Sequence, residues 1–578
     1  MLAATDPPQA AERQPLVFGP ADAQLFGWLH EPDAGALDVA VLVCGAIGIE
    51  YVNAYRALRH LAEALAALGF YALRFDYLGA GDSAQDETDP DRVAHWNDSI
   101  VAAAEALRAH SGCARVAAVG LRFGATLASV AAARAGITEL VLWNPVLSGK
   151  HYVREMRAVA ALAGYKVESG PGQLESAGFV YTAQTLRDIQ AMDLLALPFD
   201  GIQRALVIER DDLGGDTRLG DHLRQLGVAH EVQRQPGYDR MVCESLFTEV
   251  PQQAIDAIGA WLKSGARPVY GTERAAARVE PGVIELGCCR ELPLLLGPHK
   301  LFGVWCTPGG ETRNTLLVLL NSGVDHHVGP GRLHVKLARA LAAEGFASVR
   351  LDIGGVGDSA ARGNADLNRA FPPNAVAELV EVLPELARRC GRQRIVLSGI
   401  CAGAYHAFAV AQHDVGVDLP EVILLNPVQF EPERNGDAQT EVDAGRAAAF
   451  ERRQLRRRLA RAVPGSAPLV AALRFLRDRL HRARLRAFAA LRGQGAAGGG
   501  ATGLANLRRQ GRCVTLLVSP ADPGLELLQL EAPGLVRRGL REGWIGFQTI
   551  DDADHVFSSH ATRARLLEKL LARLRALG

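Results

Sequence analysis

An internal duplication is the feature that most constrains the fold of this 578-residue chain. The stretch LAEALAALGFYALRFDYLGAGDSA at 61–84 has a counterpart in LARALAAEGFASVRLDIGGVGDSA at 337–360, with an offset of 276 from Asp82 to Asp358. A second pair of matching stretches, VLWNPV and ILLNPV, has an offset of 282. The spacing is nearly constant, so the chain consists of two copies of one fold, and its length also predicts more than one domain.

The segment between the two copies predicts the domain boundary. KSGARPVYGTERAAARVEPG at 263–282 is polar and contains proline and glycine, which is typical of a linker. We expect a first domain at 1–265, a linker at 266–281 and a second domain at 282–578. The second copy carries roughly 33 additional residues after its NPV stretch, which we expect to form a helical cap at about 429–505.

Each copy alternates short apolar runs with alanine- and leucine-rich stretches of helical period. VAVLVCG, YALRFD, VAAVG, LVLWN and ALVIE are such runs in the first copy, and YRALRHLAEALAALG is such a helical stretch. Strands that are apolar on both faces and alternate with helices indicate an α/β fold with a doubly wound, mainly parallel sheet. The active site of such a sheet lies beyond the carboxyl ends of its strands.

Composition excludes several classes of function. The 63 basic and 64 acidic residues give a net charge of -1, whereas a nucleic-acid-binding protein normally carries a basic excess. The nine cysteines show no repeated CxxC spacing, which argues against both a disulfide framework and a zinc site. No signal peptide is recognisable, and no apolar run reaches the ~18 residues of a membrane helix. We expect a soluble, cytoplasmic protein without cofactor or metal.

The stretch GICAG at 399–403 follows the apolar run RIVLS and opens an alanine-rich helical pattern. A cysteine between small residues is usually a buried packing residue. In this position, however, the stretch resembles the G-x-S-x-G nucleophile elbow of α/β-hydrolases, with Cys401 in place of serine. RLDIGGVGDS upstream resembles the R-x-D-x-x-G-x-G-x-S loop of the same superfamily, and the resemblance covers nearly all of both copies.

The resemblance implies the remaining members of a catalytic triad. His555 in DADHVF stands where the family has its histidine, and Asp522 in VSPADPG stands where it has its acid. Three further aspartates compete for the acid role, namely Asp551, Asp552 and Asp554. His555 would accept the thiol proton of Cys401, while Asp522 would orient the imidazole ring.

The same resemblance predicts the groups around the substrate. The backbone N–H of Ala402 and that of Ser322 or Gly323 would form the oxyanion hole. His326 and His327 follow this loop and would contact substrate, although loop histidines are more often solvated.

The first copy lacks the nucleophile. Its elbow is GLRFG at 120–124, which puts Arg122 at the position of the cysteine; Arg240 stands at the histidine position and Asp211 or Asp212 at that of the acid. Arginine stays protonated, so it serves neither as nucleophile nor as general base. We expect a catalytically inactive domain. Two interpretations of these residues stay open, a buried ion-paired cluster and an anion site formed by the two arginines.

The predicted cap is rich in arginine. We expect it to cover the second site and to attract an acidic acyl carrier or coenzyme A, with the alternatives of membrane-surface binding and of a solvated helix face. The arginines predicted to bind substrate are Arg456, Arg457, Arg461, Arg477 and Arg482.

A closer resemblance is to the hydrolases that accompany exosortase A systems of exopolysaccharide-producing bacteria. One type there has a GLRxG elbow and another a cysteine elbow, so the chain resembles a fusion of the two. This implies an acyl hydrolase or acyltransferase that acts on an ester or thioester through a Cys401 acyl-enzyme. The alternatives are an esterase or peptidase of the serine aminopeptidase type and, from another class, a non-catalytic binding scaffold.

Overall fold

A computed structural model describes residues 13–32, 35–163, 170–269, 282–362, 367–430, 499–520, 522 and 524–577. The predicted cap lies almost entirely between 431 and 498, and most of the predicted linker lies between 270 and 281. The larger part of each predicted segment therefore lies outside the described residues.

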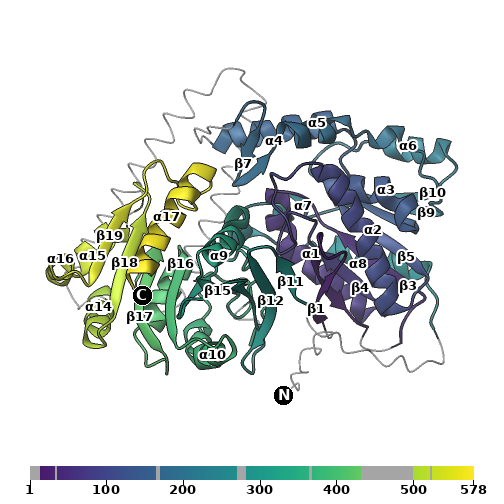
Figure 1. Cartoon of the computed structure of the whole chain (residues 1–578). Helices are drawn as coiled ribbons and strands as arrows, with labels where there is room; N and C mark the ends of the chain where they lie inside the picture. Colours follow the sequence, from purple (N-terminus) through teal and green to yellow (C-terminus); the bar gives the residue numbers. More distant parts are fainter. Residues whose placement is uncertain are drawn as a thin grey trace, which may run out of the picture. The chain divides into compact units, whose positions relative to one another are not determined.

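The first copy forms an eight-stranded sheet in the order β1-β2-β4-β3-β5-β6-β9-β10 (Figure 1). β2 is antiparallel to both of its neighbours, and the strands from β4 to β10 are parallel. This is the strand order of the α/β-hydrolase fold. The bounds are β1 Arg13–Phe18, β2 Leu25–His30, β3 Val39–Cys44, β4 Ala72–Phe75, β5 Arg115–Leu121, β6 Ile137–Trp143, β9 Arg204–Arg210 and β10 Ala229–Gln235, with a separate hairpin of β7 Leu174–Ser176 and β8 Phe179–Tyr181.

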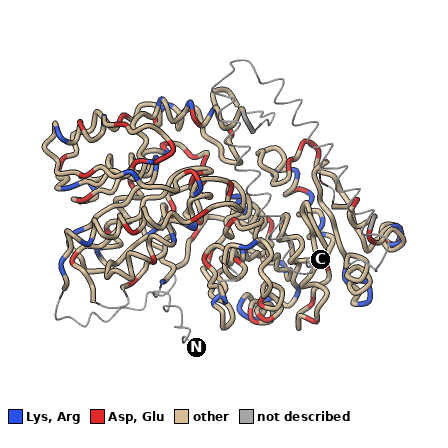
Figure 2. The backbone as a smooth tube through the Cα atoms, turned by 180° about the vertical axis from the view of Figure 1, so that it is seen from behind, with Lys and Arg blue, Asp and Glu red and all other residues tan. Residues whose placement is uncertain are grey.

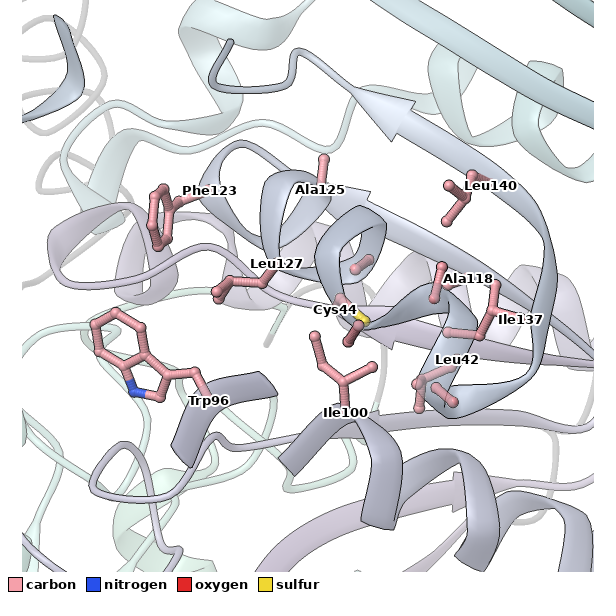
Figure 3. Packing of buried hydrophobic residues seen from close by; sticks show 14 of the residues in the cluster. Leu42, Cys44, Trp96, Ile100, Ala118, Phe123, Ala125, Leu127, Ile137 and Leu140 are labelled. Atoms are coloured by element: carbon pink, nitrogen blue, oxygen red, sulfur yellow. The ribbon is translucent and has the colours of Figure 1, made fainter. Parts of the chain in front are cut away.

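Helices cover both faces of this sheet because its strands are apolar on both sides. In β3, Leu42 and Cys44 face one helical layer, in which Ile100 of α2 and Leu127 of α3 are buried (Figure 3). The intervening Val43 packs on the other face, in a cluster that contains residues of α1 and α8. The helices of this copy are α1 Ile49–Ala67, α2 Arg92–Ser111, α3 Phe123–Ala135, α4 Gly149–Ala163, α5 Ala183–Ala191, α6 Arg218–Gln225, α7 Tyr238–Met241 and α8 Gln252–Ser264.

The strands of the second copy form two groups. Within each group, the order of neighbouring strands resembles that of the first copy. β11-β12-β13-β15 are neighbours in this order, and β14-β16-β17-β18-β19 are consecutive parallel neighbours. The bounds are β11 Ile284–Leu286, β12 Cys289–Leu296, β13 Leu301–Pro308, β14 Thr315–Leu320, β15 Ala347–Leu351, β16 Arg394–Ile400, β17 Asp418–Leu425, β18 Cys513–Val518 and β19 Ile545–Thr549. The helices are α9 Leu333–Ala343, α10 Ala375–Arg389, α11 Ala402–Val410, α14 Gly499–Arg509, α15 Gly524–Glu531, α16 Pro533–Glu542 and α17 His560–Ala576. The predicted α/β fold of two tandem sheet-bearing copies is confirmed.

The compact units of the chain differ from the predicted domains. Unit 1 comprises Met1–Asn314, Val324–Arg369 and Phe557–Gly578, and unit 2 comprises Thr315–Gly323 and Ala370–Val556. Three segments of the second copy, 282–314, 324–369 and 557–578, thus belong to the same unit as the first copy.

Acidic and basic residues are interspersed along the backbone (Figure 2). All nine cysteines are free thiols. Among the described residues, no helix is both long and apolar enough to cross a bilayer.

Candidate active site

Cys401 stands on a strained turn between a strand and a helix of unit 2. β16 ends at Ile400 and α11 begins at Ala402, and Cys401 between them has φ 58° and ψ -112°. The flanking glycines permit this turn. A Cβ on Gly399 would lie 2.5 Å from the carbonyl carbon of Gly403, and a Cβ on Gly403 would lie 2.5 Å from the carbonyl oxygen of Asn321. The sequence GICAG therefore places the cysteine at the helix N-terminus on a backbone that larger flanking residues would not fit.

The structure brings two of the predicted triad residues together. Nδ1 of His555 lies 3.1 Å from Oδ2 of Asp522. Asp522 is fixed by its own turn, because its N–H donates to the carbonyl of Ser519 and its Oδ1 accepts the N–H of Gly524, each at 3.0 Å. The carboxylate is 2% exposed and the imidazole is 43% exposed. The acid is thus buried behind a histidine that is open to solvent.

The same contacts set the charge of the histidine. Burial alone would lower the pKa of His555, but hydrogen bonds with Asp522 and Cys401 outweigh it and raise the pKa to about 10. The ring is therefore an imidazolium at neutral pH. Because Nδ1 faces Asp522, Nε2 is the nitrogen that remains for the hydrogen bond with Cys401.

Asn426 supports the loop of His555, a role that sequence analysis missed. Its Nδ2 donates to the carbonyl of His555 at 2.7 Å, and its Oδ1 accepts the N–H of Ser519, also at 2.7 Å. It thereby links the loops that carry the acid and the base. The repeated NPV motif was the available signal, since it puts one polar residue at the end of a buried strand in both copies.

The predicted oxyanion groups lie in the same unit as Cys401. The end of β14 runs against the elbow, because a Cβ on Gly403 would also lie 2.8 Å from the carbonyl oxygen of Leu320. Gly323 has φ 60°, and a Cβ built on it would meet no atom within 4 Å, so this side of the loop is open. Ala402 is the first residue of α11, so its N–H has no carbonyl partner within the helix.

His326 and His327, which were predicted to contact substrate, instead contact other side chains of the protein. Both belong to unit 1 and are 3% and 1% exposed. Nδ1 of His327 lies 2.8 Å from Asp352, and Nε2 lies 2.6 Å from Asp82. His326 stacks on Tyr55 with ring centroids 3.8 Å apart. The prediction of substrate contact is wrong for His327, because both of its ring nitrogens bind carboxylates.

His327, Asp352 and Asp358 lie close enough together to be considered as a metal site. A metal-binding histidine must offer a lone pair. Burial opposes protonation of His327, but Asp82 and Asp352 outweigh it and raise its pKa well above the ordinary value of 6.5. The ring is therefore a doubly donating imidazolium, which does not fit a metal ligand.

The elbow of the first copy has the same backbone conformation as the elbow at Cys401. Arg122 has φ 54° and ψ -120° between β5 and α3, close to the values at Cys401. Its guanidinium pairs with Glu50 at 2.8 Å and with Glu155 at 2.7 Å. Glu50 also accepts the hydroxyl of Tyr152 at 3.0 Å. An ion pair thus fills the position of the nucleophile.

The other residues predicted for this site of the first copy have different partners. Arg240 pairs with Glu249 at 2.6 Å, and both are about half exposed. Asp212 pairs with Arg210, which stands two residues before it in the chain. Asp211 is exposed. The predicted cluster of Arg122, Arg240 and these aspartates is therefore wrong, because nearer carboxylates neutralise each arginine. The pairing of both arginines with glutamates also removes support for the alternative anion site.

The five cap arginines predicted to bind substrate, Arg456, Arg457, Arg461, Arg477 and Arg482, lie outside the described residues.

Comparison with known proteins gives a partial match. Residues 41–184, in the first copy, match the family model described as serine aminopeptidase, S33. No curated protein matches the chain.

Among solved structures, Est1E from Butyrivibrio proteoclasticus is 16% identical over 43% of this chain and 98% of its own, with a TM-score of 0.32. XC6422 from Xanthomonas campestris, titled an a/b serine hydrolase without lid, is 19% identical over 45% of this chain and 96% of its own, with a TM-score of 0.30. The esterase Pf2001 from Pyrococcus furiosus is 15% identical over 44% of this chain and 93% of its own, with a TM-score of 0.31. The fold assignment rests on the strand order alone, because these TM-scores are too low to support it.

Proposed function

We propose that the second copy is an acyl hydrolase or acyltransferase that works through a Cys401 thioester. The observation that carries the proposal is the cysteine on a strained elbow, hydrogen-bonded to a histidine that a buried aspartate orients. The substrate is an ester or thioester, such as an acyl-CoA or an acyl-carrier conjugate. The resemblance to the hydrolases of exosortase A systems supports a donor of this type.

Each residue has a distinct role in the proposed reaction. The thiolate Sγ of Cys401 attacks the acyl carbonyl carbon, and the oxyanion is stabilised by N–H groups of Ala402 and of Ser322 or Gly323. The bond to the leaving alcohol or thiol breaks, and the leaving group takes a proton from His555. Water or an acceptor then gives its proton to His555 and attacks the thioester. The products are the acid or transferred acyl group and the regenerated thiolate.

Hydrolysis or transfer of esters is favoured over a binding scaffold by the exposure of the site. A purely structural cysteine would be buried and without a titratable partner, whereas the His555 ring beside Cys401 is 43% exposed. An esterase or peptidase of the serine aminopeptidase type is the second candidate, because a model of that family matches residues 41–184. The first copy is proposed to be non-catalytic, since Arg122 stands at the nucleophile position.

The test is intact mass spectrometry after brief exposure to acyl-CoA donors of several chain lengths and to an activated ester. The wild type should gain the mass of one acyl group. Cys401→Ala should gain none, and His555→Ala should gain it at least 100-fold more slowly. Cys288→Ala is the matched control, because Cys288 is exposed and belongs to unit 1.

The outcomes separate the candidates. An adduct that survives in Cys401→Ala would refute the assigned nucleophile. Turnover of the activated ester without any cysteine adduct would favour the esterase candidate with another nucleophile. Arg122→Ala should leave the adduct unchanged, and a loss there would refute the inactive role of the first copy.

A further inference from the structure

Two loops of identical pattern, one from each copy, lie in unit 1. We call Arg74–Ser83, RFDYLGAGDS, the first loop and Arg350–Ser359, RLDIGGVGDS, the second loop. Their internal hydrogen bonds are the same. The N–H of Asp82 donates to Asp76, and that of Asp358 donates to Asp352, each at 2.9 Å. The loops are therefore equivalent in structure as well as in sequence.

The arginines of the two loops exchange partners. Arg74 of the first loop pairs with Asp358 of the second loop. Arg350 of the second loop pairs with Asp82 of the first at 2.8 Å. Arg350 and Asp358 are fully buried, and the other two side chains are at most 8% exposed. Equivalent residues contact each other reciprocally, as in an isologous interface between two subunits.

Two further arginines, which are not counterparts of each other, bind equivalent carbonyls of the two loops. Arg332 of the second copy donates to the carbonyl of Gly81 at 2.8 Å. Arg59 of the first copy donates to the carbonyl of Gly357 at 2.5 Å, and Gly357 is the counterpart of Gly81 at the same offset of 276. Each loop is thus held by an arginine of the other copy.

The aromatic residues beside the loops show where the approximate twofold axis passes. Phe26 and Phe302 are counterparts at the offset of 276, and their ring centroids lie 6.2 Å apart. A residue that contacts its own counterpart lies near the axis of a twofold assembly. Trp28 packs on Phe302 with centroids 4.8 Å apart and closes this apolar centre. The interface therefore combines an apolar centre with buried ion pairs.

The position of His327 differs between the copies and favours pairing of unlike copies. The counterpart of His327 is Tyr51. Each bonds the aspartate of its own copy, Tyr51 to Asp76 at 2.6 Å and His327 to Asp352 at 2.8 Å. His327 has a further polar atom, Nε2, which lies 2.6 Å from Asp82 of the other copy, whereas the Tyr51 side chain has only its hydroxyl. A pair of two first copies would lack this bond.

We propose that this surface is a self-sufficient docking interface whose partner is the other copy of the same chain. The two copies associate as two subunits would, and the connecting segment at 270–281 is not required for association. The exchanged arginine–aspartate pairs fix how the two loops face each other, because a shifted pairing leaves buried charges without partners, and the His327–Asp82 bond favours unlike copies. The inference is independent of the catalytic proposal and needs no activity measurement.

The first test cuts the full-length chain. A protease recognition site is introduced between 270 and 281, and the folded protein is cleaved at neutral pH in 0.15 M salt. The two fragments should elute together in size-exclusion chromatography and appear as one particle in native mass spectrometry at micromolar concentration. Separation of the wild-type fragments on cleavage, or their precipitation, would overturn the proposal.

The second test removes one exchanged charge in the same cleavable chain. Asp358→Asn keeps the shape of the side chain but leaves Arg74 buried without its counter-ion, so the cleaved fragments should associate at least 100-fold more weakly. Adding Arg74→Met should restore association, since an apolar pair tolerates burial. Arg134→Met is the matched control, because Arg134 pairs with Asp98 inside the first copy at 61% and 55% exposure.

The uncut variants are examined by circular dichroism to establish that they fold. If Asp358→Asn does not fold, the equivalent Asp82→Asn takes its place in the cleaved assay. Unchanged association in the folded variant would refute the role of the exchange in pairing, even if the wild-type fragments stay together.

Discussion

The strained backbone of Cys401 predicts that glycine at this position stabilises the fold while it abolishes chemistry. An L-residue at φ 58° and ψ -112° costs about 1–3 kcal/mol, whereas glycine adopts such conformations freely. Glycine loses about 0.5–1 kcal/mol through the larger entropy of the unfolded chain. Cys401→Ala removes the same sulfur but keeps Cβ, so it is the proper reference. Cys401→Gly should therefore be about 1 kcal/mol more stable than Cys401→Ala.

Hydrogen exchange monitored by mass spectrometry measures this difference where it arises. Peptides covering β16 and α11 should exchange about fivefold more slowly in Cys401→Gly than in Cys401→Ala, which corresponds to about 1 kcal/mol of local opening free energy. Ser398, buried in β16 without a positive φ, is the matched control. There glycine should be less stable than alanine by roughly 0.5–1 kcal/mol. Equal or faster exchange in Cys401→Gly would refute the stored strain.

Two further predictions concern the polar network and the response to acid. Asn426→Ala removes the hydrogen bond to the carbonyl of His555, so it should cost about 1–3 kcal/mol and slow acylation in the mass assay; unchanged acylation would contradict a positioning role. Burial alone would raise the pKa of Glu291, but Arg339 and Arg350 outweigh it and lower the pKa from 4.5 to about 2. This stabilises the folded state by roughly 3 kcal/mol above about pH 5, and the contribution is lost as pH falls toward 2. Glu291→Gln should flatten the acid side of a profile of melting temperature against pH, and an unchanged slope would contradict the assignment.

The features that sequence predicted are those encoded locally. The alternation of apolar runs and helical stretches predicts the sheet and its helices, because burial on both faces leaves a direct mark in each strand. The elbow around Cys401 is predictable because the turn itself requires glycines at fixed spacing. Asp522 and His555 could be selected by chain order, since consecutive parallel strands end at the same edge of a sheet.

The features that sequence did not predict depend on which charged groups meet in space. Arg122 was paired with aspartates by analogy of position, but Glu50 on α1 lies nearer in the folded chain. Arg74 and Arg350 each stand two residues before an aspartate of their own loop, which suggests a local pair. Their actual partners belong to the other copy, and no periodicity or motif records such a choice.

The exchange of loop arginines has a consequence for how this gene can change over time. A substitution at Asp358 alters the cost of keeping Arg74, which lies 284 positions away in the chain, so the two positions are expected to vary together among descendants of the duplication. Deleting the first copy would leave the buried Asp358 without Arg74, and Arg350 would keep only Glu291 of its own copy. Selection can therefore retain a copy whose elbow carries arginine in place of a nucleophile, because the stability of its neighbour depends on it.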